Sequence, residues 1–107
     1  SKKSLARVRR EIHELTSPRW GMLPAETRVD ALNRLLVGWA NYFRLGPVWP
    51  AYLALDRHAR SRLRQWLRRK HKVAGRGLAR FPDRYLHQTL GLVRLTDWMR
   101  TLPWANA

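Results

Sequence analysis

The sequence of 107 residues contains no cysteine, only seven acidic residues and no long hydrophobic run. Without cysteine the chain can form neither a disulfide nor a thiolate metal site, which fits a reducing compartment. No apolar run approaches the roughly 18 residues of a membrane-spanning helix, and no signal-peptide core follows the basic start. We therefore expect neither a transmembrane helix nor a signal peptide.

The scarcity of acids also argues against an active site in this chain. The seven carboxylates are scattered, and the sequence has no paired-aspartate polymerase signature, no glycine-rich phosphate loop and no nucleophile motif. The four histidines are not spaced as metal ligands. We expect a chain that is not catalytic by itself and that holds no metal or cofactor.

Basic residues, in contrast, are abundant, and they give the chain a formal net charge of +15. A field this strong attracts phosphate polymers or anionic lipid, so nucleic acid and a membrane surface are the partners to weigh. Disorder does not fit, because the chain is 45% hydrophobic and has six Trp, enough apolar surface for one core. A core this small is usually only marginally stable alone.

Apolar residues recur at helical spacing in three stretches. They predict a first helix over residues 4–16, a second over about 25–44 and a third that follows Pro50 and runs to about Lys72. Trp39 and Trp66 lie on the apolar stripes of the second and third helices and are expected in the core. We predict an all-α fold, a three-helix bundle with a basic, partly irregular C-terminal extension.

The C-terminal part of the sequence is less regular. Gly75 and Gly77 indicate a mobile basic loop over residues 73–80, and a short helix is predicted over residues 83–90. The remainder fits either a docked strand or a docked helical turn. We divide the chain into a helical domain, residues 1–74, and a basic extension, residues 75–107.

The third predicted helix carries the most informative charges. Residues 57–107 hold 13 bases and two acids, net +11, whereas residues 1–56 hold nine bases and five acids, net +4. On a helix Arg57, Arg60, Arg64 and Arg68 occupy an arc of about 80° and span roughly 16 Å, the length of several phosphates. A solvated face is the simpler interpretation, but four like charges on adjacent turns repel one another. We therefore favour a phosphate-binding ridge that contributes little to the fold.

The other tryptophans leave two roles open. Trp20, Trp49, Trp98 and Trp104 lie in or near predicted turns. There an indole can fill the core or stack on an unpaired base.

Three segments together resemble the maturase-specific domain of group II intron-encoded reverse transcriptases. They are LNRLLVGWANYFRLG from Leu32 to Gly46, the pair Leu55-Asp56, and LRQWLRRKHK from Leu63 to Lys72. The start, SKKSLARVRREIHELTS, is similar to the beginning of that domain, so the resemblance covers residues 1 to about 74. The remainder is similar to the C-terminal ends of some bacterial members that lack an endonuclease domain.

The resemblance implies a function. The domain would be the polymerase thumb, also called domain X, which binds group II intron RNA to promote splicing and contacts the template-primer duplex. The C-terminal extension would contact target DNA. The parent protein would be a cytoplasmic bacterial RNA-directed DNA polymerase of a mobile element, with its catalytic domains upstream, and Mg²⁺ would come with the RNA. The family often has a basic residue where this chain has Val37, so no RNA contact is carried over there.

Two rival functions remain beside RNA binding. A helical DNA-binding domain with no intron role would present short polar side chains to base edges, whereas the third helix offers mostly arginine. A membrane-surface helix would place its apolar stripe in lipid, but that stripe has partners on the other helices. The residues expected to bind RNA are Arg57, Arg60, Arg64, Arg68, Arg69, Lys70, Lys72, Arg76, Arg80, Asn41, Arg44, Lys2 and Lys3.

Overall fold

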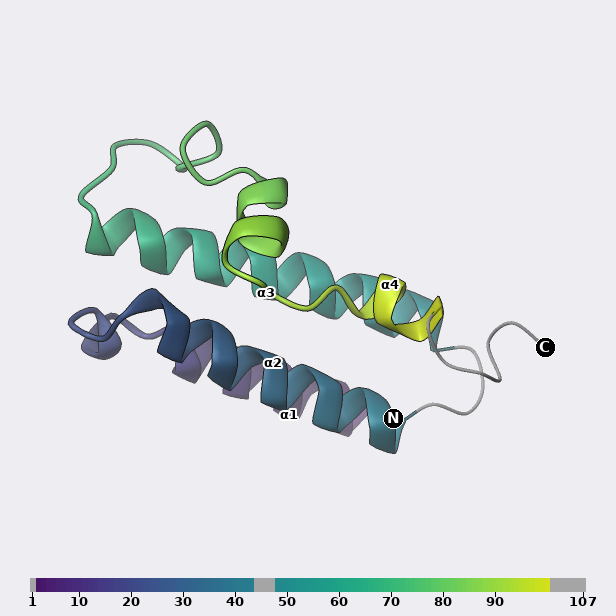
Figure 1. The fold of residues 1–107 in the computed structure, drawn as a ribbon. Coiled ribbons are helices and arrows are strands. Elements are labelled where there is room, and N and C mark those ends of the chain that lie inside the picture. Colours follow the sequence, from purple (N-terminus) through teal and green to yellow (C-terminus); the bar gives the residue numbers. More distant parts are fainter. Residues whose placement is uncertain (1, 44–47, 101–107) are drawn as a thin grey trace.

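The computed structural model describes the backbone of residues 2–43 and 48–100, and the side chains of residues 4–43 and 48–98. Its elements are α1 (Lys2–Leu15), η1 (Pro18–Trp20), α2 (Ala25–Tyr42), α3 (Trp49–Lys70), η2 (Tyr85–Thr89) and α4 (Leu95–Arg100). The described residues contain no strand, and the predicted all-α fold is confirmed. In Figure 1, α1 and α2 lie side by side with α3 along them, and the following segment turns back along α3 to α4.

The long helices begin and end close to their predicted limits. Pro50 stands in the first turn of α3, where a missing N–H costs nothing. At the other end, Lys72 adopts a left-handed conformation with φ 54°. The N–H of Val73 donates to the carbonyl of Arg68 at 2.9 Å, and the N–H of Lys72 donates to that of Arg69 at 3.3 Å. This Schellman motif ends α3 two residues before the predicted limit.

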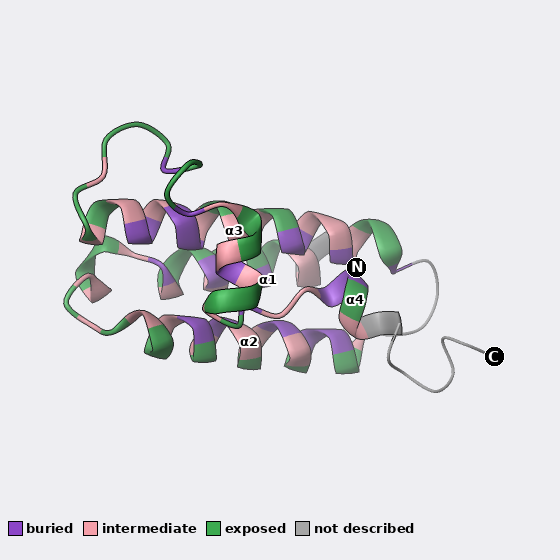
Figure 2. Ribbon diagram, turned by 45° about the horizontal axis from the view of Figure 1, so that its top comes forward, coloured by how far each residue is buried: buried purple, intermediate pink, exposed green. Residues whose placement is uncertain are grey.

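One hydrophobic core joins the long helices to the C-terminal extension. Buried residues line the inner sides of α1, α2 and α3 (Figure 2). Trp39 and Trp66 are both buried, as predicted. Because the extension also supplies buried side chains, it is packed onto the helices. The core consists of Val8, Ile12, Val29, Leu32, Leu36, Trp39, Ala40, Val48, Tyr52, Leu55, Ala59, Leu63, Trp66, Leu67, Phe81, Leu86, Leu92 and Leu95.

The loop after α3 rests directly on that helix. Gly77 is buried and has a φ of 77°. A Cβ atom built on Gly77 would lie 3.5 Å from the Cβ of Arg68 and 3.5 Å from a ring carbon of Phe81. The backbone of the loop therefore lies in contact with the side-chain stems of α3.

The predicted helix over residues 83–90 forms, but most of it, η2, is a π-helix and therefore wider than an α-helix. In η2 the N–H of Leu90 donates to the carbonyl of Tyr85 at 3.0 Å, a π-type bond. The segment after η2 is held by Asn33 of α2. The Asn33 amide donates to the carbonyl of Gly91 at 2.9 Å and accepts the N–H of Val93 at 2.7 Å.

The last described element is a helix, α4, which decides between the two predicted alternatives. Its start is bonded to Asp56, a buried carboxylate on α3. Asp56 accepts the N–H of Leu95 at 2.7 Å and both the N–H and the hydroxyl of Thr96 at 3.1 Å. A side chain of α3 thus satisfies the first N–H groups of α4.

Candidate nucleic-acid interface

Two of the four arginines of the predicted ridge are engaged inside the protein. The side chain of Arg64 is only 11% exposed, donates to the carbonyl of Phe81 at 2.7 Å and pairs with Asp83. Arg60 lies 3.4 Å from the same carboxylate. The predicted exposed ridge is therefore interrupted at Arg60 and Arg64, and the expectation that both contribute little to the fold is corrected. The physical reason is that the C-terminal extension folds back over α3 and brings an acid with it.

The carboxylate between these two arginines is held in its ionised form. Burial raises the pKa of Asp83, but the hydrogen bond from Arg64 and the charge of Arg60 outweigh this effect, so the pKa lies below its ordinary value. Asp83 is thus charged at neutral pH and partly neutralises two guanidinium groups.

His87 completes this cluster from η2. Its Nδ1 lies 2.8 Å from the carbonyl of Leu92, and its Nε2 lies 3.4 Å from a nitrogen of Arg60. Burial lowers the pKa of His87, the hydrogen bond to the carbonyl of Leu92 offsets part of this effect, and the charges of Arg94 and Arg60 lower the pKa further. A neutral ring that donates from Nδ1 and accepts at Nε2 satisfies both contacts.

Lys70 is also engaged, although it was expected to bind RNA. Its ammonium group donates to the carbonyls of Gly21 and Leu23, at 3.0 Å and 2.9 Å. Lys70 therefore ties the end of α3 to the α1–α2 loop and uses two of its three donors there.

The other expected cations are largely directed outward. Arg57, Arg69, Lys72, Arg76 and Arg80 are exposed, and Arg68 is half-buried. Within residues 4–43 and 48–98, none of these six side chains has an acidic partner. Asn41 is exposed on α2. Arg44 and the side chains of Lys2 and Lys3 lie outside the described residues.

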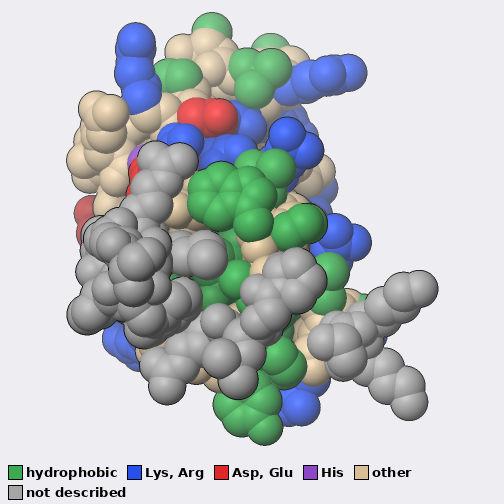
Figure 3. Space-filling view, turned by 90° about the vertical axis from the view of Figure 1, so that its right-hand side faces the viewer, with side chains coloured by type: hydrophobic (Ala, Val, Ile, Leu, Met, Phe, Trp, Pro, Cys, Tyr) green, Lys and Arg blue, Asp and Glu red, His purple; other side chains and the backbone are tan. Residues whose placement is uncertain are grey.

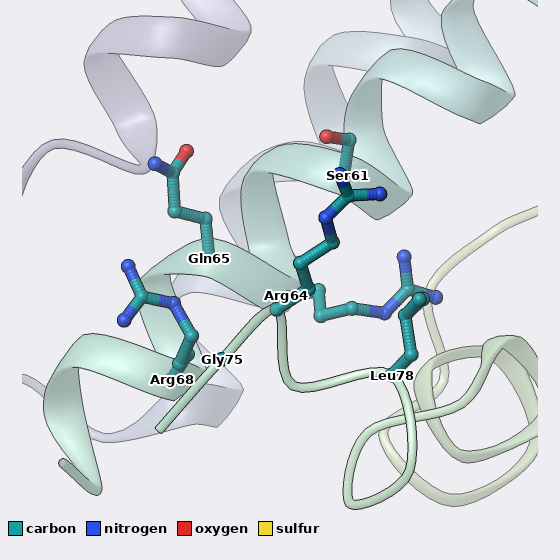
Figure 4. Close-up of a pocket in the computed structure, with 7 residues that line it drawn as sticks. Ser61, Arg64, Gln65, Arg68, Gly75 and Leu78 are labelled. Carbon is teal, nitrogen blue, oxygen red and sulfur yellow. The ribbon is translucent and has the colours of Figure 1, made fainter. Parts of the chain in front are cut away.

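The structure brings some of these cations together around two hollows. The first is a cavity of about 420 Å³ between α3 and the loop, which includes Arg68 and Arg76 in its wall. Figure 4 shows Ser61, Gln65 and Arg68 on α3 and Gly75 and Leu78 on the loop. The second, of about 300 Å³, is lined by Arg80 and Arg84. We call Arg68, Arg76, Arg80 and Arg84 the basic face.

Sequence reasoning missed several residues that line these hollows, and four of them offer groups that a ligand could contact. They are Ser61, Gln65 and Leu78 in the first and Arg84 in the second. Arg84 follows Arg80 by four residues, but Pro82 and Asp83 between them obscured any helical pattern. The other three carry no signal in the sequence, because their role depends on where the loop lies.

The end of the bundle at which α1 begins exposes hydrophobic and aromatic side chains (Figure 3). Figure 3 views this end and shows hydrophobic side chains across the middle of the face, with Lys and Arg side chains at its edges. Tyr42, at the end of α2, is 80% exposed, and Trp49, at the start of α3, is 41% exposed. Large aromatic side chains in such positions are typical of contact surfaces.

In the part of the chain that the structure describes, no group of three or more His, Asp or Glu residues could hold a metal ion. Among the same residues no helix combines the length and the apolar character that crossing a membrane requires.

Comparison with known proteins places the chain in a family. The family model for the group II intron, maturase-specific domain matches residues 5–86. No curated protein and no solved structure gives a significant match. The match extends past residue 74, the limit of the resemblance in the sequence, and it includes Asp83. Because it covers more than half of the chain, this protein belongs to the group II intron maturase-specific domain family.

Proposed function

We propose that this domain binds group II intron RNA and promotes its splicing. The observation that carries the proposal is the basic face, in which Arg68, Arg76, Arg80 and Arg84 surround two hollows without an acidic partner among the described residues. Arginine suits phosphate because its planar fork bonds two oxygens at once. Family membership makes intron RNA the polyanion to expect.

The mechanism is electrostatic and conformational. Arginines of the basic face neutralise phosphates where segments of the RNA approach one another, and binding releases the counterions that those phosphates held. The folded intron becomes more stable, while the RNA with its own Mg²⁺ performs the chemistry. The internal bond of Arg64 serves this indirectly, because it fixes the end of the loop that carries Arg76 and Arg80.

We extend the proposal to a whole intron-encoded reverse transcriptase, of which this domain would be one part. The domain would serve as the thumb of an intron-encoded reverse transcriptase and contact the template-primer duplex, and the C-terminal extension would contact target DNA. The exposed aromatic rings of Tyr42 and Trp49 support this, because they lie at the end where α1 begins and where preceding polymerase domains would attach.

Competition between nucleic acids tests the choice of partner. A structured group II intron RNA and a DNA duplex of equal length and charge compete for the domain in filter binding at one salt concentration. The RNA should bind more tightly, because 2′-hydroxyl groups and A-form shape add contacts that DNA lacks. Equal affinity would favour the rival, a helical DNA-binding domain with no intron role.

A splicing assay tests the maturase activity itself. A group II intron precursor is incubated at a Mg²⁺ concentration too low for efficient self-splicing, with and without the domain. The domain should raise the splicing rate, and Arg76→Gln with Arg80→Gln should reduce this effect. The matched control is Arg9→Gln with Arg10→Gln, two exposed residues of α1. A control pair that loses as much activity would show that only total charge matters.

A further inference from the structure

The cavity between α3 and the loop has features that phosphate binding alone does not require. From it we infer that the domain captures one unstacked nucleotide of the bound RNA. Arg68 and Arg76 hold its phosphate, and Leu78 covers its base or sugar. The inference rests on the proposed RNA binding and specifies a site within it.

The size and charge of the cavity suit this ligand. Its volume of about 420 Å³ lies within the range of roughly 300–1,000 Å³ that small-molecule pockets occupy. Arg68 and Arg76 have no acidic partner among the described residues, whereas Arg64, which also lines the cavity, is paired with Asp83. Two guanidinium groups therefore remain for an anion.

Two polar side chains of α3 that line the cavity offer hydrogen bonds of a kind that reads a base edge or a 2′-hydroxyl group. Ser61 is exposed on α3, and its hydroxyl can donate and accept. The side-chain oxygen of Gln65 accepts from Arg62 at 2.9 Å. This bond orients the amide and leaves its NH₂ group with no partner in the described part of the chain.

One wall of the cavity is apolar and exposed. Leu78 is 54% exposed, so the hydrophobic core does not account for its position. An apolar side chain next to two arginines is well placed to pack against the flat face of a base, which every nucleotide presents. A site for inorganic phosphate would gain nothing from it.

The cavity is also held in shape before any ligand binds. The positive φ of Gly77 and its contact with the stem of Arg68 seat the loop on α3. Arg64 fixes the far end of the loop through the carbonyl of Phe81. Such preorganisation reduces the entropy that ligand binding must overcome.

The test uses two RNA hairpins that differ in one bulged nucleotide, with binding to the full chain measured by fluorescence anisotropy. The bulged hairpin should bind about five- to tenfold more tightly, the lower end of what one base contact contributes. Ser61→Ala with Leu78→Ala should remove this preference without changing the salt dependence. Arg68→Gln with Arg76→Gln should weaken both hairpins and flatten the slope of log affinity against log salt by roughly 1.4 to 1.8.

The alternative outcomes separate this inference from the proposed function. Equal affinity for the two hairpins, or a preference that survives Ser61→Ala with Leu78→Ala, would overturn the nucleotide site but leave RNA binding intact. Inorganic phosphate that displaced both hairpins equally would indicate a site for phosphate alone. If neither hairpin bound with a salt-dependent affinity, the proposed function would fail as well. Unchanged circular dichroism melting of each variant confirms that its fold is retained.

Discussion

The carboxylate of Asp56 accepts the backbone N–H of Leu95 at 2.7 Å and so joins α3 to α4 across 39 positions of the sequence. A carboxylate at a helix start is doubly suited to this position, since it bonds free N–H groups and meets the positive end of the helix dipole. The same side chain also bonds Thr96 twice. Asp56, a residue of the family resemblance, thus anchors the C-terminal extension.

Replacing this carboxylate should detach α4. Asp56→Ala leaves the buried N–H groups of Leu95 and Thr96 without acceptors, at a cost of about 1–3 kcal/mol each. We expect a lower thermal midpoint and fast hydrogen exchange at both amides. Asn33→Ala, which releases the neighbouring segment on the α2 side, should produce a similar but smaller effect. Slow exchange at Leu95 in Asp56→Ala would contradict the anchoring role.

Arg64 and Arg68 of α3 should respond differently to replacement by Gln. Arg64→Gln breaks the bonds to Asp83 and Phe81 and should lower the thermal midpoint. Arg68→Gln removes a cation that has no acidic partner among the described residues, so it should leave the melting curve unchanged and weaken RNA binding. Asp83→Asn should resemble Arg64→Gln in stability. If Arg64→Gln also left the melting curve unchanged, the original prediction of an exposed ridge would be correct.

Substitutions of Trp66 test whether its indole belongs to the hydrophobic core. Its side chain is 1% exposed, and truncation to Ala should cost about 3–5 kcal/mol, which is enough to unfold a small domain. The indole N–H of Trp66 is buried and has no acceptor among the described residues. Trp66→Phe removes this unsatisfied donor and should therefore cost much less than Trp66→Ala. An unchanged melting curve for Trp66→Ala would show that the indole is not a core group.

Lys72 carries backbone strain at the end of α3. A left-handed conformation costs a residue with a side chain about 1–2 kcal/mol. Glycine avoids this cost but loses more conformational entropy on folding, which offsets about 0.5–1 kcal/mol. Lys72→Gly should therefore stabilise the domain by a net amount of about 0.5–1 kcal/mol. Lys72→Ala removes the same charge and keeps the strain, which makes it the matched control. Chemical denaturation should rank the Gly variant above both others, while RNA binding should weaken equally in the two variants.

Stability should fall in mildly acidic solution because of His87. Its pKa is lowered in the folded protein, chiefly by burial, so the unfolded chain binds the proton more readily. The free energy of unfolding should therefore decrease as the pH falls below about 6.5, the ordinary histidine value, and level off below the folded pKa. His87→Gln should flatten this dependence.

A second histidine, His58, should contribute to the same pH dependence. Burial also lowers the pKa of His58, so His58→Gln should flatten the same dependence further. A pH profile that is identical in wild type and in the double variant would exclude both rings as its source.

The sequence by itself determined the three long helices, their inward faces and the basic character of the chain. Helical spacing of apolar residues is a local property, and it placed Trp39 and Trp66 correctly in the core. The family resemblance was likewise readable, because it lies in contiguous segments such as Leu63 to Lys72. The limits of α3 differed by only two residues, where the left-handed Lys72 ends the helix without the usual glycine.

Only the tertiary structure decided which cations face outward. On helical spacing alone Arg60 and Arg64 are equivalent to Arg57 and Arg68. The return of the C-terminal extension distinguishes them, because it brings Asp83 and the carbonyl of Phe81 onto one part of α3. Ion pairs of this kind join positions that no sequence period relates. The cavity has the same origin, since its two walls meet only after Gly77 packs against α3.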